Sequence, residues 1–355
     1  MEFQPKCMAT AIGSMPHSDP ERALDVIFDA LPEAPIWPQL SRLGLREQME
    51  IQYSEGLPRA VIDEAKGRMF IDTSGDYSDD LARFYEGYLA AEDGGDCSAG
   101  AISPAFAAGI PVLERRLQAL GRRLPCVKCQ TTGPISFALT IVDENKRAIY
   151  YNEEFLDAVV KGLLLKCRWQ IQKLRPYAER VLCFIDEPIL AAFGSSTYVS
   201  VQRADVIARL GEVIAAVHQE GAIAGVHCCG NTDWSLLVDA DADIISFDAY
   251  EFGETIALYP EHLRRHLGER GKTIAWGIVP TKPAVREETV PSLIDRFEQR
   301  TEHLAKHSGV DTNTIAKQAL ITPSCGTGSM EVAAAERVFK LLGELSPALR
   351  KRYGF

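Results

Sequence analysis

The feature that most constrains this 355-residue chain is an alternation between short β-branched apolar runs and longer stretches with helical periodicity. The helical stretches are clearest at Glu153–Lys173, Ala204–Glu220, Pro291–Lys306 and Glu331–Leu342. Strand–helix alternation of this kind indicates parallel strands joined by crossover helices. Eight strands therefore predict an α/β fold of the (β/α)8 or TIM barrel type. The eight runs are Cys7–Gly13, Ile36–Leu40, Cys126–Gln130, Val181–Asp186, Ile223–His227, Asp243–Asp248, Thr273–Val279 and Gln318–Thr322.

Residues 41–120 depart from this alternation. They have a mixed polar composition and one clear helical stretch, near Tyr77–Ala91. We expect them to form an insertion above the barrel. No Pro/Ser-rich linker, internal repeat or low-complexity tract divides the chain, so the sequence predicts a single barrel domain over residues 1–355. A doubly wound open sheet is the structural alternative, but no GxGxxG motif follows the first predicted strand.

The charge balance limits the class of partner. Lys and Arg number 38 against 49 Asp and Glu, which gives a net charge of −11. An acidic chain of this kind argues against nucleic acid or an anionic membrane as the main partner, because both favour basic patches. No run approaches the roughly 18 apolar residues of a membrane span. The N-terminal residues lack the pattern of a signal peptide, so we expect a cytoplasmic protein.

The nine cysteines are odd in number and irregular in spacing, which does not indicate a disulfide framework. The options for each one are a buried apolar thiol, a metal ligand or a reactive thiolate. Cys126 and Cys129 have the CxxC spacing of redox and zinc motifs. They lie inside a predicted strand, where residues i and i+3 point to opposite sides, so we favour packing roles for both.

Polar or metal-binding side chains follow nearly every predicted strand. In parallel α/β folds the chemistry lies at the C-terminal ends of the strands, so this placement predicts one shared site. The strand ends in question are Gly13–Ser14, Thr131–Gly133, Asp186–Glu187, His227–Cys229, Asp248, Pro280–Lys282 and Ser324–Cys325.

The segment His227-Cys228-Cys229 carries the strongest indication of a metal. In an extended segment His227 and Cys229 point to the same side and Cys228 to the other. Imidazole and thiolate are ligands that Zn²⁺ prefers. Cys325 is the natural third ligand, and Asp248 is a candidate fourth ligand or outer partner. Taken alone, a His-x-Cys tripeptide more often belongs to the core, but the matching strand ends favour the metal.

Two other strand ends offer groups for a substrate. Asp186 can bind an ammonium group or take part in proton transfer. The alternative for the Asp186-Glu187 pair is an N-cap of the following helix. Gly13 allows a ligand to approach the backbone closely, and Ser14 follows it.

Together these segments resemble the catalytic C-terminal half of cobalamin-independent methionine synthase, a zinc-dependent (β/α)8 methyltransferase. The resemblance extends from about Ala9 to Gly326 and is weakest over residues 41–120. Four separate strand ends agree with the family in order, which makes the resemblance fairly specific. The matching segments are Ile12-Gly13-Ser14, Thr132-Gly133-Pro134, Ile185-Asp186-Glu187-Pro188, His227-x-Cys229, Asp241–Asp248 and Pro323-Ser324-Cys325-Gly326.

The resemblance implies a role for each residue. The backbone around Ile12 and Gly13, with Ser14, would hold the carboxylate of homocysteine, and Asp186 would hold its amino group. The zinc ligands would be His227, Cys229 and Cys325, with Asp248 at the position of a fourth. The implied reaction transfers a methyl group to the zinc-bound thiol and yields methionine. The implied methyl donor is methyltetrahydrofolate or a methylcorrinoid protein.

The zinc and acid–base positions also show departures from the family. Asp248 stands where the family has a Glu, so its carboxylate reaches about one methylene less far. Glu251 and Glu254 lie close in the sequence and offer alternatives. The proton-donor His of the family corresponds to Lys282 or its neighbour Thr281, which makes Lys282 the candidate catalytic residue.

The methyl-donor side departs further. Thr140 and Ala192 stand at the positions of two folate contacts. This pattern resembles the short, single-barrel relatives that use a methylcorrinoid donor. Uroporphyrinogen decarboxylase relatives share the barrel but not the zinc ligands.

We therefore expect a zinc-dependent thiol methyltransferase. Two alternatives stay open. The first is another barrel enzyme, either a methylcorrinoid:thiol transferase for a different thiol or a decarboxylase. The second is a non-catalytic barrel that binds zinc or a corrinoid partner.

Overall fold

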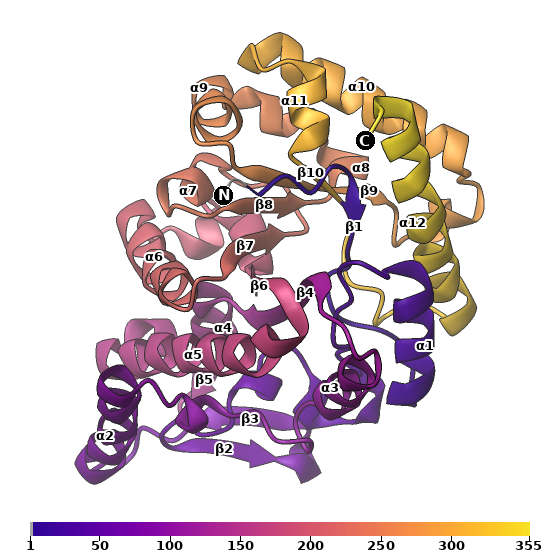
Figure 1. Cartoon of the computed structure of the whole chain (residues 1–355). Helices are drawn as coiled ribbons and strands as arrows, with labels where there is room; N and C mark the ends of the chain where they lie inside the picture. Colours follow the sequence, from indigo (N-terminus) through magenta and orange to yellow (C-terminus); the bar gives the residue numbers. More distant parts are fainter. Residues whose placement is uncertain (1–2) are drawn as a thin grey trace.

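A curled sheet of seven parallel strands forms the centre of the protein (Figure 1). The computed structural model describes residues 3–355. The strands are β1 (Met8–Ala9), β4 (Leu124–Thr132), β6 (Ala178–Asp186), β7 (Ile223–Cys228), β8 (Ile244–Phe247), β9 (Thr273–Val279) and β10 (Ala319–Pro323). They pair in the order β1-β10-β9-β8-β7-β6-β4, always in parallel. The predicted α/β architecture with parallel strands is confirmed.

One of the eight predicted strands, Ile36–Leu40, is not a regular strand, so the expectation of a closed eight-stranded barrel was wrong. The segment lies between the two edges of the sheet, and its ladder pairing is limited to isolated bridges. Gln39 bridges to Ser14 in the loop after β1, and Ile36 bridges to Lys128 of β4. Pro35 and Pro38 explain the irregularity, because proline has no N–H to donate to a strand ladder.

Helices cover the outside of the curled sheet (Figure 1). Those that we expected from periodicity occur within a few residues of the predicted bounds, except that the last one is longer. This helix extends to Tyr353, and Pro347 lies inside it without ending it. The long helices are α1 (Pro20–Ala30), α5 (Glu153–Leu174), α6 (Arg203–Gln219), α10 (Val290–Ser308) and α12 (Val332–Tyr353). Shorter ones are α4 (Pro134–Thr140), α7 (Ser235–Asp239), α8 (Ala249–Phe252), α9 (Pro260–Leu263) and α11 (Thr312–Lys317).

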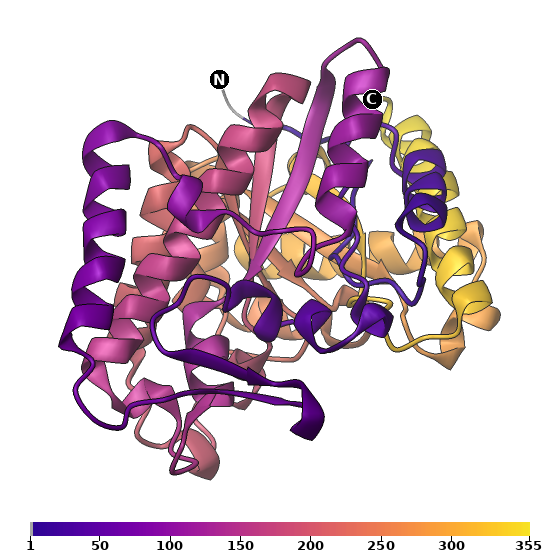
Figure 2. The same cartoon turned by 90° about the horizontal axis from the view of Figure 1, so that it is seen from below.

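Most of residues 41–120 form a layer beside α5, as Figure 2 shows from below, whereas the last helix of this stretch, α3 (Gly109–Ala119), packs against α1. Three short 3-10 turns are followed by an antiparallel hairpin and two helices. The second hairpin strand also pairs with a short strand after α4, in a three-stranded sheet. The elements are β2 (Ala60–Asp63), β3 (Arg68–Ile71), α2 (Ser78–Gly94), α3 (Gly109–Ala119) and β5 (Val142–Asp143).

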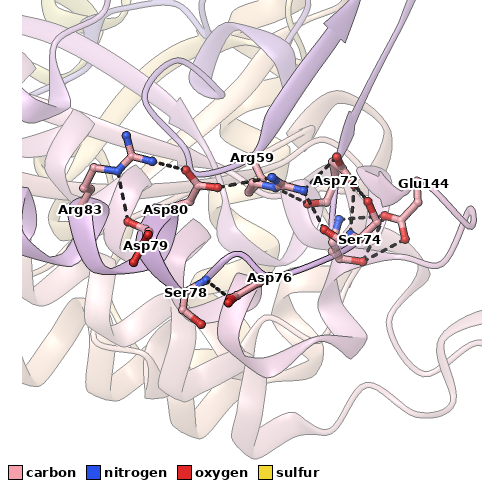
Figure 3. A network of polar contacts seen from close by, with 10 residues as sticks. Arg59, Asp72, Ser74, Asp76, Ser78, Asp79, Asp80, Arg83 and Glu144 are labelled. Atoms are coloured by element: carbon pink, nitrogen blue, oxygen red, sulfur yellow. Dashed lines mark hydrogen bonds and ion pairs between the residues drawn. The ribbon is translucent and has the colours of Figure 1, made fainter.

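A polar network holds the hairpin of this layer against its neighbours (Figure 3). The Arg59 guanidinium donates to Asp72 at 3.0 Å and to Asp80 of α2 at 3.5 Å. Glu144, beyond β5, accepts a hydrogen bond from the backbone N–H of Thr73 at 2.8 Å. These groups are partly exposed, so each pair contributes little stability, and the network mainly fixes orientation.

The inner face of the sheet changes from apolar to polar along the strands. Residues i and i+2 of a strand share a face, and the strand register aligns these faces around the curl. Leu182 and Phe184 lie low on this face of β6, and Asp186 ends it. Cys126 lies on the inner face and Cys129 in the outer core, so the two thiols diverge as expected. The polar groups of the inner face therefore gather at the C-terminal edge.

Candidate metal centre

Three predicted metal ligands come together at the C-terminal edge of the sheet. His227 is the penultimate residue of β7, Cys229 follows the strand directly, and Cys325 follows β10. Their ligand atoms all lie within 4.8 Å of one another. One imidazole and two thiols, held by separate strand ends, match the donor set of a catalytic zinc site, which uses three protein ligands and keeps one position open.

The His227 ring is fixed in the orientation that a metal ligand requires. It is 3% exposed, and its Nδ1 lies 2.9 Å from the Oγ of Ser246 on β8. The other ring nitrogen, Nε2, is buried without a hydrogen-bond partner. Because buried polar atoms normally have partners, an unpaired Nε2 next to two thiols fits a metal ion.

The two thiols differ in their affinity for a proton. Hydrogen bonding from the Cys325 thiol, together with the nearby His227 ring, lowers the pKa of Cys229 to about 4. The neighbouring Cys229 sulfur and burial raise the pKa of Cys325. The pair therefore holds one thiolate readily, and thiolate is the form that binds a metal. Cys228 points away into the core, as predicted, and burial raises its pKa to about 12.

A cavity of about 290 Å³ opens beside the three ligands. Asp186 lines it, and its Oδ1 is buried without a partner. Burial raises the pKa of Asp186 to about 6, a rise that the ammonium group of Lys128 opposes. An unpaired carboxylate oxygen next to a metal-binding cluster offers a position for a cationic group of a ligand. Gln48 and Met49, from residues 41–120, form another part of the lining.

The loop after β1 forms one wall of the cavity. Ile12 and Ser14 line it, whereas a Cβ on Gly13 would meet the side chain of Gln130 at 3.0 Å. Ser14 is held by the loop after β10, because its Oγ accepts a hydrogen bond from the N–H of Gly328 at 3.2 Å. A Cβ on Gly326 would lie 2.1 Å from that Oγ, so only glycine allows this approach.

Asp248 does not join the three ligands. Its carboxylate caps α8 by accepting a hydrogen bond from the N–H of Glu251 at 2.9 Å, and burial raises its pKa to about 6. The two alternative acids are engaged elsewhere. Glu251 pairs with Lys282 at 2.5 Å, and Glu254 pairs with Arg300. Within residues 3–355, the three-residue group of His227, Cys229 and Cys325 is the one that could hold a metal.

Lys282 lies at the rim of the site. Its side chain is 58% exposed, and its ammonium group is paired with Glu251, a contact that raises its pKa. It does not belong to the cavity lining among the described residues. Its catalytic role therefore stays a prediction.

Glu187, next to Asp186, has a structural role. It is fully buried and accepts hydrogen bonds from the N–H groups of Ile135 and Ser136, at 2.9 and 2.8 Å. Burial raises its pKa to about 7, against these hydrogen bonds. The capping alternative thus applies to Glu187. The helix that Glu187 caps is α4, which follows β4, and not the helix that follows Glu187 in the sequence.

Sequence reasoning missed two buried groups of the site. Ser246 orients the His227 ring, and its signal was its position two residues before Asp248 on the inner face of β8. Lys128 lies beneath the cavity wall. Its signal was a lysine between Val127 and Cys129 in the middle of a predicted strand, since lysine is almost never fully buried without a partner.

A scan of protein-family models and a search of curated proteins found no match to this chain. Within residues 3–355, no helix combines the length and apolar character needed to cross a membrane. The functional assignment therefore depends on the geometry of the site.

Proposed function

We propose that the chain is a zinc-dependent methyltransferase that transfers a methyl group to a small thiol. Homocysteine is the first candidate acceptor, and methionine would be the product. The observation that carries the proposal is the convergence of His227, Cys229 and Cys325 on a cavity that also contains the unpaired oxygen of Asp186. Zinc held by these three residues would bind the acceptor sulfur as a thiolate, the form that attacks a methyl carbon.

The remaining residues would bind the two charged ends of an amino-acid thiol. Asp186 would accept hydrogen bonds from the ammonium group, because its Oδ1 is buried without a partner. Ser14 and the backbone of Ile12 and Gly13 would hold the carboxylate at another wall of the cavity. These two contacts would orient the sulfur toward the metal position among His227, Cys229 and Cys325.

The methyl donor would approach over the layer of residues 41–120, whose Gln48 and Met49 line the cavity. Thr140 and Ala192, in place of the family's folate contacts, favour a methylcorrinoid protein over methyltetrahydrofolate. Lys282 could serve proton transfer only by leaving Glu251, and Asp248 would act as an outer partner. Nine free thiols among the described residues agree with a reducing compartment such as the cytoplasm.

The first test measures zinc in purified protein. We expect about one zinc per chain in the wild type and its loss in Cys229→Ala. Cys228→Ala is the matched control, because it removes the adjacent thiol that points into the core, and it should keep the metal. Stoichiometric zinc in Cys229→Ala would contradict the ligand assignment, and the absence of zinc from the wild type would refute the proposal.

The second test identifies the substrates. In cobalt-substituted protein, added homocysteine should add a thiolate-to-cobalt band at the metal. Methyl transfer to homocysteine is then measured with methyltetrahydrofolate and with methylcobalamin as donors. A band without transfer from either donor would leave a thiol-binding metal site and refute the methyltransferase.

A further inference from the structure

Lys128 is a fully buried cation beneath the cavity wall. It projects from β4 into the curled sheet and is 0% exposed. Its Nζ donates to the carbonyl oxygen of Ile12 at 2.5 Å and to Oε1 of Gln130 at 3.2 Å. The same nitrogen lies 4.6 Å from the centre of the Phe184 ring, which adds a cation–π contact. The lysine thus joins β4 to the loop after β1.

Gln130 extends this contact to the irregular segment Ile36–Leu40. Its Nε2 donates to the carbonyl oxygen of Trp37 at 3.1 Å, between the two prolines that interrupt the segment. The backbone carbonyl oxygen of Gln130 accepts hydrogen bonds from the hydroxyl of Tyr53 at 3.0 Å and from Nε2 of Gln170 at 3.1 Å. One buried network therefore connects the loop after β1, β4 and the 36–40 segment where regular strand pairing is missing.

The network supports the cavity without entering it. The described residues that line the cavity include Ile12 and Ser14 but no lysine or arginine. Lys128 contacts the wall from behind, through the Ile12 carbonyl. Gly13 lies against the Gln130 side chain, so the backbone of this wall is restrained on two consecutive residues.

We propose that Lys128 is a positioning residue, whose ammonium group fixes the Ile12–Ser14 wall against β4 and thereby shapes the carboxylate end of the acceptor site. The inference about the acceptor rests on the proposed function, whereas the fixing of the wall does not. A methionine would fill the same space without donating, so the wall would lose a charge-assisted hydrogen bond that regular pairing does not replace.

The cost of burying this group supports a specific role. An ammonium group in an apolar interior is destabilising unless it is paired and hydrogen-bonded. Burial lowers the pKa of Lys128 to about 8, so it remains largely charged at neutral pH. Asp186, at the cavity, is the carboxylate whose charge favours this state.

The chain offers a matched control for a test of this proposal. Lys166 of α5 is 1% exposed and donates to the carbonyl oxygen of Glu55 at 2.6 Å. Burial also lowers its pKa to about 8. Lys166→Met removes the same kind of group from the opposite side of the sheet, away from the cavity. It therefore reports the general effect of deleting a buried ammonium group.

The first readout is hydrogen–deuterium exchange of residues 12–16 and 36–41 in the full chain, which needs no substrate. We expect exchange in Lys128→Met to be about tenfold faster than in the wild type and in Lys166→Met. Equal exchange in Lys128→Met and the wild type would overturn the proposal, as would the same increase in Lys166→Met. If Lys128→Met does not fold, Lys128→Gln replaces it under the same criteria.

The second readout is thiol binding to the cobalt-substituted protein. Lys128→Met should bind homocysteine about tenfold more weakly, with the affinity for cysteamine, which keeps an ammonium group but has no carboxylate, unchanged. Equal weakening for both thiols, or loss of cobalt, would overturn a role at the carboxylate end. If the wild type binds neither thiol, the proposed function fails, and the exchange experiment still decides the role of Lys128 in the wall.

Discussion

Replacing Ser246 by Ala should weaken zinc binding, although Ser246 is not a ligand. A His that binds through Nε2 must carry its proton on Nδ1, and in this protein Nδ1 lies 2.9 Å from the Ser246 Oγ. The ring is 3% exposed and Ser246 is 0% exposed, so water cannot easily replace the lost oxygen. The variant would leave His227 free to adopt the tautomer that has a proton on Nε2 and cannot bind a metal.

The magnitude follows from the geometry. Outer partners of this kind contribute about 10- to 100-fold in metal affinity, or about 1.4–2.8 kcal/mol. A buried Nδ1 without a partner should also lower the free energy of unfolding of the metal-free protein by about 1–3 kcal/mol. Both effects have the same origin, so they should appear together.

The assay is competition for zinc between the protein and a coloured chelator at fixed pH. Ser308→Ala is the control, because Ser308 is also buried and donates to the carbonyl oxygen of Leu304 at 2.8 Å, far from the ligands. It should lose some stability and no zinc affinity. A zinc affinity in Ser246→Ala within about twofold of the wild type would refute the reasoning.

Two further predictions concern stability. Hydrogen bonding to Asp243 raises the pKa of His218 above its ordinary value of 6.5, so the stabilisation by this pair is complete below pH 6.5 and is lost as the pH rises through the raised pKa. His218→Asn should therefore lower the free energy of unfolding, measured by urea denaturation, more at pH 6 than at pH 8. The difference should be only about 0.5 kcal/mol because the pair is partly exposed, and an equal loss at both pH values would contradict the assignment. In Gly133→Ala, the new Cβ would lie 2.1 Å from the carboxyl carbon of the fully buried Glu187. We expect a loss of about 2–3 kcal/mol in thermal denaturation, and an unchanged melting temperature would show that Glu187 can move.

The parallel α/β fold was predictable because each strand and helix carries its own periodicity. The irregularity of Ile36–Leu40 was not predicted from its apolar character, which is typical of a strand. It follows from Pro35 and Pro38, which have no N–H to donate to a strand ladder. The ligand cluster was predictable because parallel strands place their ends at one edge. That rule states which edge a residue occupies and gives no direction for its side chain.

Asp248 and Lys128 show this limit of the rule. Asp248 ends a strand as expected, but the N–H of Glu251 takes its carboxylate as a helix cap. Lys128 lies in mid-strand, and its reach up to the Ile12 carbonyl depends on the length of its side chain and on how the sheet curls. Such contacts arise from the packing of several elements, which no single segment of the sequence contains.

The order of the strands has a consequence for how the protein is made. The first strand, β1, pairs in the sheet only with β10, the last strand to leave the ribosome. Cys325 follows that last strand, whereas His227 and Cys229 are synthesised well before it. During translation the segment that carries His227 and Cys229 is therefore made without the third ligand, and contacts of this long sequence separation form slowly. The candidate metal centre would be complete only when β10 has paired in the sheet and brought Cys325 to the other two ligands, so a product truncated before β10 should hold no metal even if most of its helices have formed.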